Sequence, residues 1–220
     1  MTDFVIGIDV QAARSCPFAI IEVSSSSILE TGWIAANDLI ESVQGLASRY
    51  KDAAFAIDAP RMALPVPRVW YWRKRGWQRG TGEEKGRGRH CEVVIKAYNL
   101  ANPQWTPLLE DAPEWMRHGF TIFDALEGRS LTLEVFPSAS YRMLENAQDV
   151  RVDFPLTGFL QGPKDMLDAI VAAVTGSEFL CGRGQEVGGG DELGTIVLPR
   201  PITDARTEVL HWPSGVVHQT

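Results

Sequence analysis

The sequence contains few cysteines and no long apolar run. Its three cysteines, Cys16, Cys91 and Cys181, are widely spaced and form no Cys-x-x-Cys pair. This pattern argues against both a disulfide framework and a structural zinc site. No apolar stretch approaches the roughly 20 residues that cross a bilayer, and no cluster of cations precedes the first apolar segment. We therefore expect a cytoplasmic protein with reduced thiols, no signal peptide and no membrane partner.

The chain also lacks an overall excess of positive charge, which by itself disfavours nucleic acid as a partner. Its 220 residues carry a net charge of −7, with 45% apolar and 22% charged residues, as is usual for a globular protein. The distribution is uneven, however. Residues 61–90 contain nine Lys or Arg and two acids, whereas the remaining chain contains 12 basic and 26 acidic residues. This asymmetry predicts a local site for an anion.

The hydrophobic pattern predicts an α/β fold. The expected strands span residues 3–10, 17–23, 28–34, 53–58, 130–136 and 194–199. A helix is expected to begin near 37, and others to span 91–99, 113–127, 137–145 and 163–175. Short connections make the first three strands an antiparallel meander, and later crossovers add parallel strands. The result is a mixed sheet with helices on both faces.

The domain organisation is expected to be simple. Residues 1–200 show no internal repeat and no clean boundary, so we expect one domain, followed by a tail over 201–220. The segment 61–90 is irregular, basic and rich in tryptophan, which indicates an insertion. A structureless loop of this length is uncommon and is usually functional or mobile.

Two carboxylates stand at the ends of the most apolar strands. Asp9 closes the first strand, and Asp58 closes the strand that follows the first helix. A right-handed crossover places these strands side by side and parallel, so the two side chains should meet at one edge of the sheet. Taken singly, an Asp at a strand end is more often a turn starter or an N-cap.

Three further acids are candidates for the same site. Asp165 and Asp168 lie together on helix 163–175, opposite its apolar face. Asp165 is also explained by a favourable interaction with the helix dipole. Glu134 lies on an alternating strand, where a solvated face is an equally good interpretation.

Carboxylates that converge repel each other, and a hard divalent cation relieves the repulsion. Mg²⁺ or Mn²⁺ would bind the oxygens of Asp9, Asp58 and Asp168, which we expect to be the catalytic residues. Asp165 or Glu134 would supply a further ligand. Such ions can assist phosphodiester hydrolysis by activating water and holding the leaving oxygen.

The basic segment interleaves cations with aromatic residues in the stretch Trp70-Tyr-Trp-Arg-Lys-Arg-Gly-Trp77. Cations that follow phosphates and rings that stack on bases are typical of single-stranded nucleic-acid binding. An equally good interpretation is that the tryptophans anchor the loop to the core. The candidate substrate-binding residues are Arg73, Lys74, Arg75, Arg79, Arg89, Trp70, Trp72 and Trp77.

These motifs resemble the ribonuclease H-like superfamily, especially bacterial Holliday-junction resolvases, and more closely an uncharacterised family of predicted nucleases with that fold. The matching elements are Gly7-Ile-Asp9, Ile57-Asp-Ala-Pro60, Arg89-His-Cys-Glu92, Glu134-Val-Phe-Pro137 and Asp165-x-x-Asp168-Ala169. The resemblance implies a ribonuclease H-like fold, acidic metal ligands and a nucleic-acid substrate, single-stranded or branched. The sequence departs from the pattern after Asp9, where residues 10–14 contain no glycine for close phosphate approach.

Two other functions fit parts of the sequence. A nucleotide-binding phosphotransferase of the actin and sugar-kinase class also begins with an Asp-containing strand, but it needs glycine-rich phosphate loops. The only candidate loop, residues 182–190, precedes a strand rather than a helix. A non-catalytic nucleic-acid-binding module on the same fold is the second alternative, because a fold alone does not confer activity.

Overall fold

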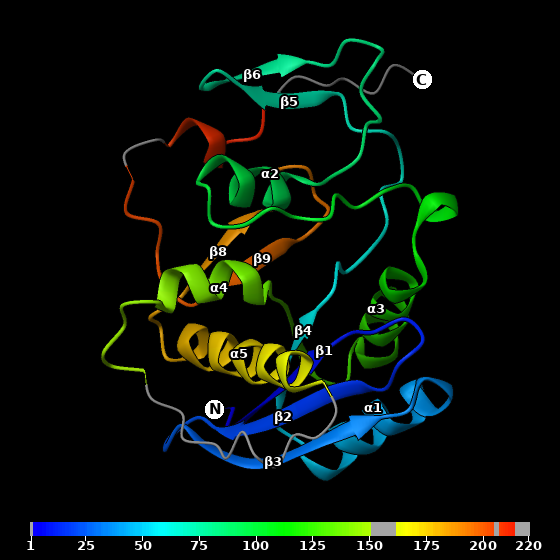
Figure 1. Cartoon of the computed structure of the whole chain (residues 1–220), viewed down its shortest axis with the longest axis vertical. Helices are drawn as coiled ribbons and strands as arrows, with labels where there is room; N and C mark the ends of the chain where they lie inside the picture. The colour runs from blue at the N-terminus through cyan, green and yellow to red at the C-terminus, as the bar shows by residue number, and fades with distance from the viewer. Residues whose placement is uncertain (1, 151–161, 205–206, 214–220) are drawn as a thin grey trace.

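The structure is a computed structural model that describes residues 2–150, 162–204 and 207–213 (Figure 1). Its main sheet has five strands in the order β3-β2-β1-β4-β7. They are β1 (Phe4–Asp9), β2 (Cys16–Glu22), β3 (Ser27–Ile34), β4 (Ala54–Asp58) and β7 (Leu131–Glu134). Strands β1, β2 and β3 are antiparallel neighbours, whereas β4 runs parallel to both β1 and β7. The predicted mixed α/β sheet is therefore confirmed.

Helices cover both faces of this sheet, as expected. Helices α1 (Leu39–Arg49) and α3 (Glu114–Leu126) bury side chains such as Val43 and Ile122 against one face. Helix α5 (Pro163–Leu180) packs on the other face, with α4 (Pro137–Leu144) beside it (Figure 1). The central strands β1 and β4 are buried on both sides, which explains why they are apolar at almost every position.

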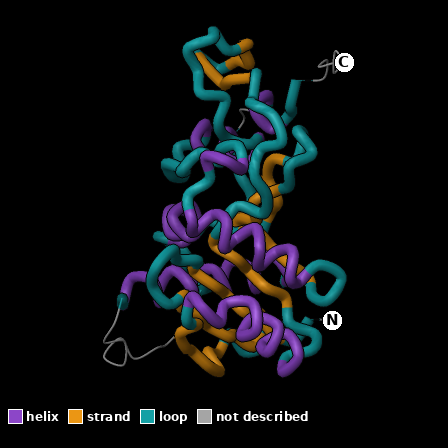
Figure 2. The backbone as a smooth tube through the Cα atoms, turned by 90° about the vertical axis from the view of Figure 1, so that its right-hand side faces the viewer, coloured by secondary structure: helices purple, strands orange, loops and turns teal. Residues whose placement is uncertain are grey.

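A second layer of smaller elements lies beyond the carboxyl end of β4, and β9 (Thr195–Leu198) joins it to β7 and α5 (Figure 1). Figure 2 shows the same chain turned by 90°. The second layer contains the hairpin β5 (Trp70–Arg73) and β6 (Gly76–Arg79), helix α2 (His90–Ala97), and the hairpin β8 (Gln185–Gly188) and β9. Short 3₁₀ helices span Ala36–Asp38, Leu109–Asp111 and Glu208–Leu210. Helix α2 and strands β8 and β9 share their own apolar core.

Three elements differ from the expectations. The segment 61–90 is not structureless, because Lys74 and Arg75 adopt φ values of 49° and 69° and form the tight turn of the β5–β6 hairpin. Strand β9 pairs with β8 in a separate two-stranded sheet, and Val197 makes a bridge to Val135 next to β7. Part of the expected tail also packs on the hairpin: the rings of Trp212 and Trp77 lie 5.0 Å apart, so this described part of 201–220 belongs to the second layer.

Helix α5 continues past Gly176, where the sequence predicts its end. Gly176 packs against Val5 of β1 and Ala56 of β4, so its missing side chain permits close approach of helix and sheet rather than a C-cap. Gly7 of β1 makes the same kind of contact. A Cβ atom at Gly7 would lie 2.1 Å from the carbonyl oxygen of Ala169 and 2.5 Å from the amide nitrogen of Ala173.

We predict that Gly7→Ala destabilises the protein by about 3 kcal/mol, because backbone atoms of α5 cannot yield to the added methyl group. Urea unfolding of both proteins measures the difference. Gly45→Ala on α1 is the control, since a Cβ there meets nothing within 4 Å and alanine favours the helix. Equal stability of Gly7→Ala and wild type would contradict the close packing of α5 on β1.

Candidate functional site

The register of the two central strands brings Asp9 and Asp58 together. β1 and β4 pair in parallel with Asp9 opposite Asp58, at the carboxyl ends of both strands. The right-handed crossover argument correctly predicted this juxtaposition. Adjacent parallel strands are about 4.8 Å apart, so the two carboxylates leave the same edge of the sheet as neighbours.

Burial and mutual repulsion perturb both carboxylates. Burial, followed by the nearby Asp168 and Asp165, raises the pKa of Asp9 to about 7. The pKa of Asp58 lies well above its ordinary value, again through burial first and then through Asp9 and Asp168. Strand ends β1 and β4 and helix α5 therefore concentrate negative charge in one place. Perturbed carboxylates of this kind are typical of functional sites.

Partners engage Asp168 and Asp9 directly. The hydroxyl of Tyr141 on α4 donates to Oδ1 of Asp168 at 2.8 Å, and Nζ of Lys164 donates to Oδ2 at 2.5 Å. The side-chain amide of Gln11 donates to Oδ2 of Asp9 at 2.6 Å. Within the residues that the structure describes, no three acidic, histidine or cysteine side chains are grouped so as to hold a metal ion as they stand.

Asp165 lies at the margin of this group. Its Oδ2 is 3.1 Å from a guanidinium nitrogen of Arg14. It also belongs to the first turn of α5, where a carboxylate favours the helix dipole. Its position fits an outer electrostatic role at least as well as metal ligation.

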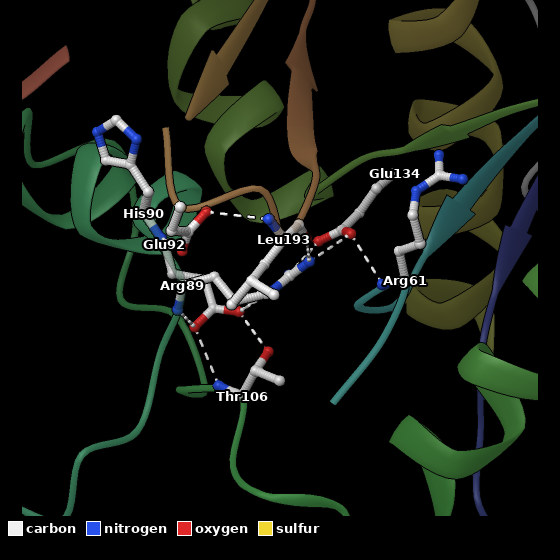
Figure 3. Close-up of polar contacts among 8 residues, drawn as sticks. Arg61, Arg89, His90, Glu92, Thr106, Glu134 and Leu193 are labelled. Atoms are coloured by element: carbon white, nitrogen blue, oxygen red, sulfur yellow. Dashed lines mark hydrogen bonds and ion pairs between the residues drawn. The ribbon is translucent and has the colours of Figure 1, made fainter. Parts of the chain in front are cut away.

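Glu134 makes a different contact from the one expected of a metal ligand (Figure 3). Both of its carboxylate oxygens accept hydrogen bonds from the guanidinium of Arg89, and Oε2 also accepts from the backbone amide of Arg61 at 2.8 Å. The carboxylate is buried. Direct metal binding would require breaking the Arg89 pair, so we exclude Glu134 from the proposed ligand set.

Protein groups engage the guanidinium of Arg89 on several sides. Its side chain is 1% exposed and also donates to Glu92, at 3.0 Å from Nη2 and 3.1 Å from Nε, and to the carbonyl of Leu193 at 3.3 Å. Glu92 in turn accepts from the hydroxyl and the amide of Thr106. These contacts give Arg89 a structural role in addition to the expected substrate contact, which stays a prediction: the residue joins β7, α2 and the loop before β9 (Figure 3).

A cavity of about 440 Å³ connects the two groups of charged residues. Asp9, Asp58 and Glu134, from the carboxyl ends of three neighbouring strands, line it together with Arg89, Glu92 and Gln104. The strand ends and the second layer therefore enclose a space with strongly acidic walls. The structure thus places Glu134 in the same cavity as the aspartates, although its oxygens are already paired.

The four cations of the β5–β6 hairpin have different surroundings. Lys74 and Arg75 are exposed at the turn. Arg73 forms an ion pair with Glu84, and the guanidinium of Arg79 lies 5.6 Å from the ring of Trp70. These four cations remain candidates for contact with an anionic substrate.

The tryptophans at the centre of the hairpin mainly pack. The rings of Trp72 and Trp77 meet edge to face at 5.5 Å, and Trp77 also contacts His90 at 5.7 Å and Trp212 at 5.0 Å. This arrangement supports the anchoring interpretation for Trp72 and Trp77. Trp70 instead has Arg79 near its ring.

Three residues of the site were not expected from the sequence. Lys164 lies one helical turn before Asp168, so its i,i+4 spacing could have indicated the ion pair. Gln11 follows Asp9 by two positions, and Tyr141 reaches Asp168 only because α4 packs beside α5. No local sequence pattern predicts the contact between Tyr141 and Asp168, because it depends on the packing of two helices.

Comparison of this chain with protein-family models, curated proteins and solved structures found no match. Among the described residues, no helix combines the length and apolar character that a membrane span requires. The function must therefore be argued from the site itself.

Proposed function

We propose that this protein is a metal-dependent nuclease that hydrolyses phosphodiester bonds. The observation that carries the proposal is the pairing of Asp9 with Asp58 at adjacent parallel strand ends, with Asp168 near enough to raise the pKa of both. Packing three acids together without a compensating ion is unfavourable. Selection for a cation-binding site explains why the chain tolerates this cost.

The donor set fits a hard divalent ion by its chemistry. Carboxylate oxygens are the ligands that Mg²⁺ and Mn²⁺ prefer, and Asp9, Asp58 and Asp168 offer three of them. Such an ion would supply positive charge for a phosphate oxygen and activate a water molecule. In its absence the ammonium of Lys164, which bonds to Asp168 at 2.5 Å, neutralises part of the charge. Rotation of the Asp168 side chain away from Lys164 would free its oxygens for the ion.

The other residues of the site would control geometry. Tyr141 holds one oxygen of Asp168, and burial together with this carboxylate raises the pKa of its hydroxyl, which keeps Tyr141 protonated as a donor. Gln11 holds one oxygen of Asp9. Hydrogen bonds of this kind orient carboxylates toward a metal ion.

We predict that Asp9→Asn and Asp168→Asn each reduce Mn²⁺-dependent cleavage at least about a hundredfold, because each removes a charged ligand. The assay uses end-labelled single-stranded, double-stranded and branched DNA, and RNA, with Mn²⁺, with Mg²⁺ or with a chelator. Asp124→Asn is the matched control, since Asp124 is an exposed acid on α3. Cleavage that survives in both site variants would refute the assignment.

The carboxylate oxygens of Asp9 and Asp168 already accept hydrogen bonds from protein groups, and the described residues form no ready metal site. This observation favours one second candidate function, a nucleic-acid-binding module without catalytic activity. It predicts oligonucleotide binding that neither the chelator nor Asp9→Asn affects, with no cleavage by wild type. The phosphotransferase alternative gains no such support. Gly188 packs against Cys91 and Gly190 against His90 and Trp212, so these glycines serve packing rather than a phosphate cradle.

A further inference from the structure

A second cavity, of about 430 Å³, lies between the basic insertion and the segment 104–116. Its walls include Arg68, Tyr71, Lys85, Arg87 and Trp105. It shares Gln104 with the cavity that contains Asp9 and Asp58. The two cavities are therefore neighbours, and a single extended ligand could occupy both.

Arg68 is the unusual residue of this cavity. Its guanidinium lies 4.4 Å from the centre of the Tyr71 ring and 5.1 Å from that of Trp105, so aromatic faces support it. Its Nε and Nη1 atoms are buried, and in the described part of the chain neither has a hydrogen-bond partner. Buried polar groups are nearly always paired, and an unpaired guanidinium N–H indicates a missing acceptor.

The loop that presents Arg68 has a fixed geometry. The amide of Arg68 donates to the carbonyl of Gly86 at 2.7 Å. The Tyr71 hydroxyl accepts from the amide of Gly86 at 3.0 Å and donates to the carbonyl of Arg68 at 3.3 Å. Gly86 has a φ of 63°, and a Cβ there would lie 2.6 Å from Cβ of Pro67. These bonds fix the backbone of Arg68 and the side chain of Tyr71, whose ring face supports the guanidinium.

The charges around Arg68 are mostly positive. A smaller cavity of about 280 Å³ shares Arg68, Tyr71 and Trp105 and adds Arg73 and Lys96 to its wall. The two cavities together contain five cations, Arg68, Arg73, Lys85, Arg87 and Lys96, and two carboxylates, Glu84 and Asp111. Both carboxylates are occupied, since Glu84 pairs with Arg73 and Asp111 with Arg87. These two pairs also occupy Arg73 and Arg87, so Arg68, Lys85 and Lys96 carry the excess positive charge of the walls, which favours an anion as the acceptor for Arg68.

We propose that Arg68 is the centre of a phosphate-binding subsite that holds one phosphodiester of a nucleic-acid strand next to the carboxylate cavity. This inference rests on the proposed nuclease function for the identity of the ligand. Arginine suits a phosphate because it donates several hydrogen bonds in a fixed plane. The ring faces of Tyr71 and Trp105 already support Arg68, so the subsite recognises the backbone rather than a base and is indifferent to sequence.

The test is the binding of fluorescein-labelled oligo-dT to the full chain in the presence of a chelator, measured by fluorescence anisotropy. We expect Arg68→Gln to weaken binding roughly tenfold, as the loss of a charge-assisted contact would. The slope of log affinity against log salt should fall by about 0.7, the value for one phosphate contact with a single strand. Arg68→Lys should recover part of the affinity, because it keeps the charge and loses the planar donor array.

Two further variants guard against effects on folding. Lys85→Gln changes an exposed residue in the cavity wall and should weaken binding in the same direction. Lys51→Gln removes a charge just before β4, at the opposite edge of the sheet, and should leave binding unchanged. Wild-type affinity in Arg68→Gln would overturn the proposal, whatever the affinity of Lys85→Gln.

The outcomes separate this subsite from the nuclease proposal. If Asp9→Asn abolishes cleavage while Arg68→Gln binds DNA normally, the subsite is wrong and the nuclease assignment stands. If Arg68-dependent binding persists in a protein that cleaves nothing, the subsite stands and the nuclease assignment fails. Pyrophosphate that binds in an Arg68-dependent way, with no competition from oligo-dT, would assign the cavity to a small phosphorylated molecule and overturn its assignment to a strand.

Discussion

Replacing Asp9 by asparagine should stabilise the metal-free protein by about 4 kcal/mol at pH 8. The pKa of Asp9 is raised from 3.8 to about 7 by burial and by Asp168 and Asp165. Each pKa unit corresponds to about 1.4 kcal/mol. Ionisation of Asp9 at pH 8 therefore lowers the free energy of unfolding of wild type by most of this amount. Asparagine has a similar shape but does not ionise, so the variant avoids the loss.

The effect has a defined dependence on pH. Between about pH 4 and pH 7 the folded protein holds a proton on Asp9 that the unfolded chain has released, so the stability of wild type falls as the pH rises. Below pH 4 both states are protonated and the difference from Asp9→Asn should be small. Above pH 7 the difference should reach a plateau. Urea unfolding at pH 4, 6 and 8 in the presence of a chelator measures this series.

The same unfolding experiment with Mn²⁺ in place of the chelator tests whether the destabilising carboxylate of Asp9 binds a metal ion. An ion that binds only the folded state stabilises wild type in proportion to RT ln(1 + [Mn²⁺]/Kd), and Asp9→Asn should gain far less. The exposed Asp124→Asn should track wild type in both conditions. A stability difference between wild type and Asp9→Asn that does not vary with pH would contradict a strained carboxylate at this position.

The aspartate pair was predictable because it depends on rules that act along the chain. Apolar runs on both faces marked β1 and β4 as central strands, and the handedness of the crossover then fixed their order and direction. The approach of α5 to β1 depends on Gly7, whose missing side chain leaves room for the backbone of Ala169. The expected ribonuclease H-like fold stays a prediction beyond this mixed α/β sheet.

The second layer was less predictable, because its contacts join residues that are far apart in sequence. Arg89 and Glu134 are 45 positions apart in sequence and form an ion pair that no periodicity reveals. Trp77 packs against Trp212, 135 positions later in the numbering of the chain. The pattern of aromatic and cationic residues fitted a binding surface and an anchoring role equally well, and the ring contacts of Trp72 and Trp77 support anchoring for these two residues. Arg68 carried no signal beyond its charge, since its lack of an acceptor is a property of the folded loop.

Replacing Arg89 by methionine should have the second large effect, a destabilisation of about 3–5 kcal/mol at neutral pH, the range for a broken buried ion pair. Arg89 separates the buried carboxylates of Glu92 and Glu134 and donates to both. Methionine would leave two buried negative charges without a cation. Burial already raises the pKa of Glu134, and Arg89 opposes that increase; without Arg89 its pKa should rise further.

This loss should grow with pH, because a carboxylate whose pKa is raised in the folded state loses stability as the pH rises through that pKa. Urea unfolding at pH 5 and pH 8 measures it, with Arg87→Met as the control. Arg87 lies two positions earlier and pairs with Asp111 at the surface, where such pairs contribute about 0–1 kcal/mol. Combining Arg89→Met with Glu92→Leu and Glu134→Leu should recover much of the stability, since apolar side chains can replace a buried ionic cluster. An Arg89→Met protein as stable as wild type but weak in oligonucleotide binding would instead show that Arg89 contacts the substrate.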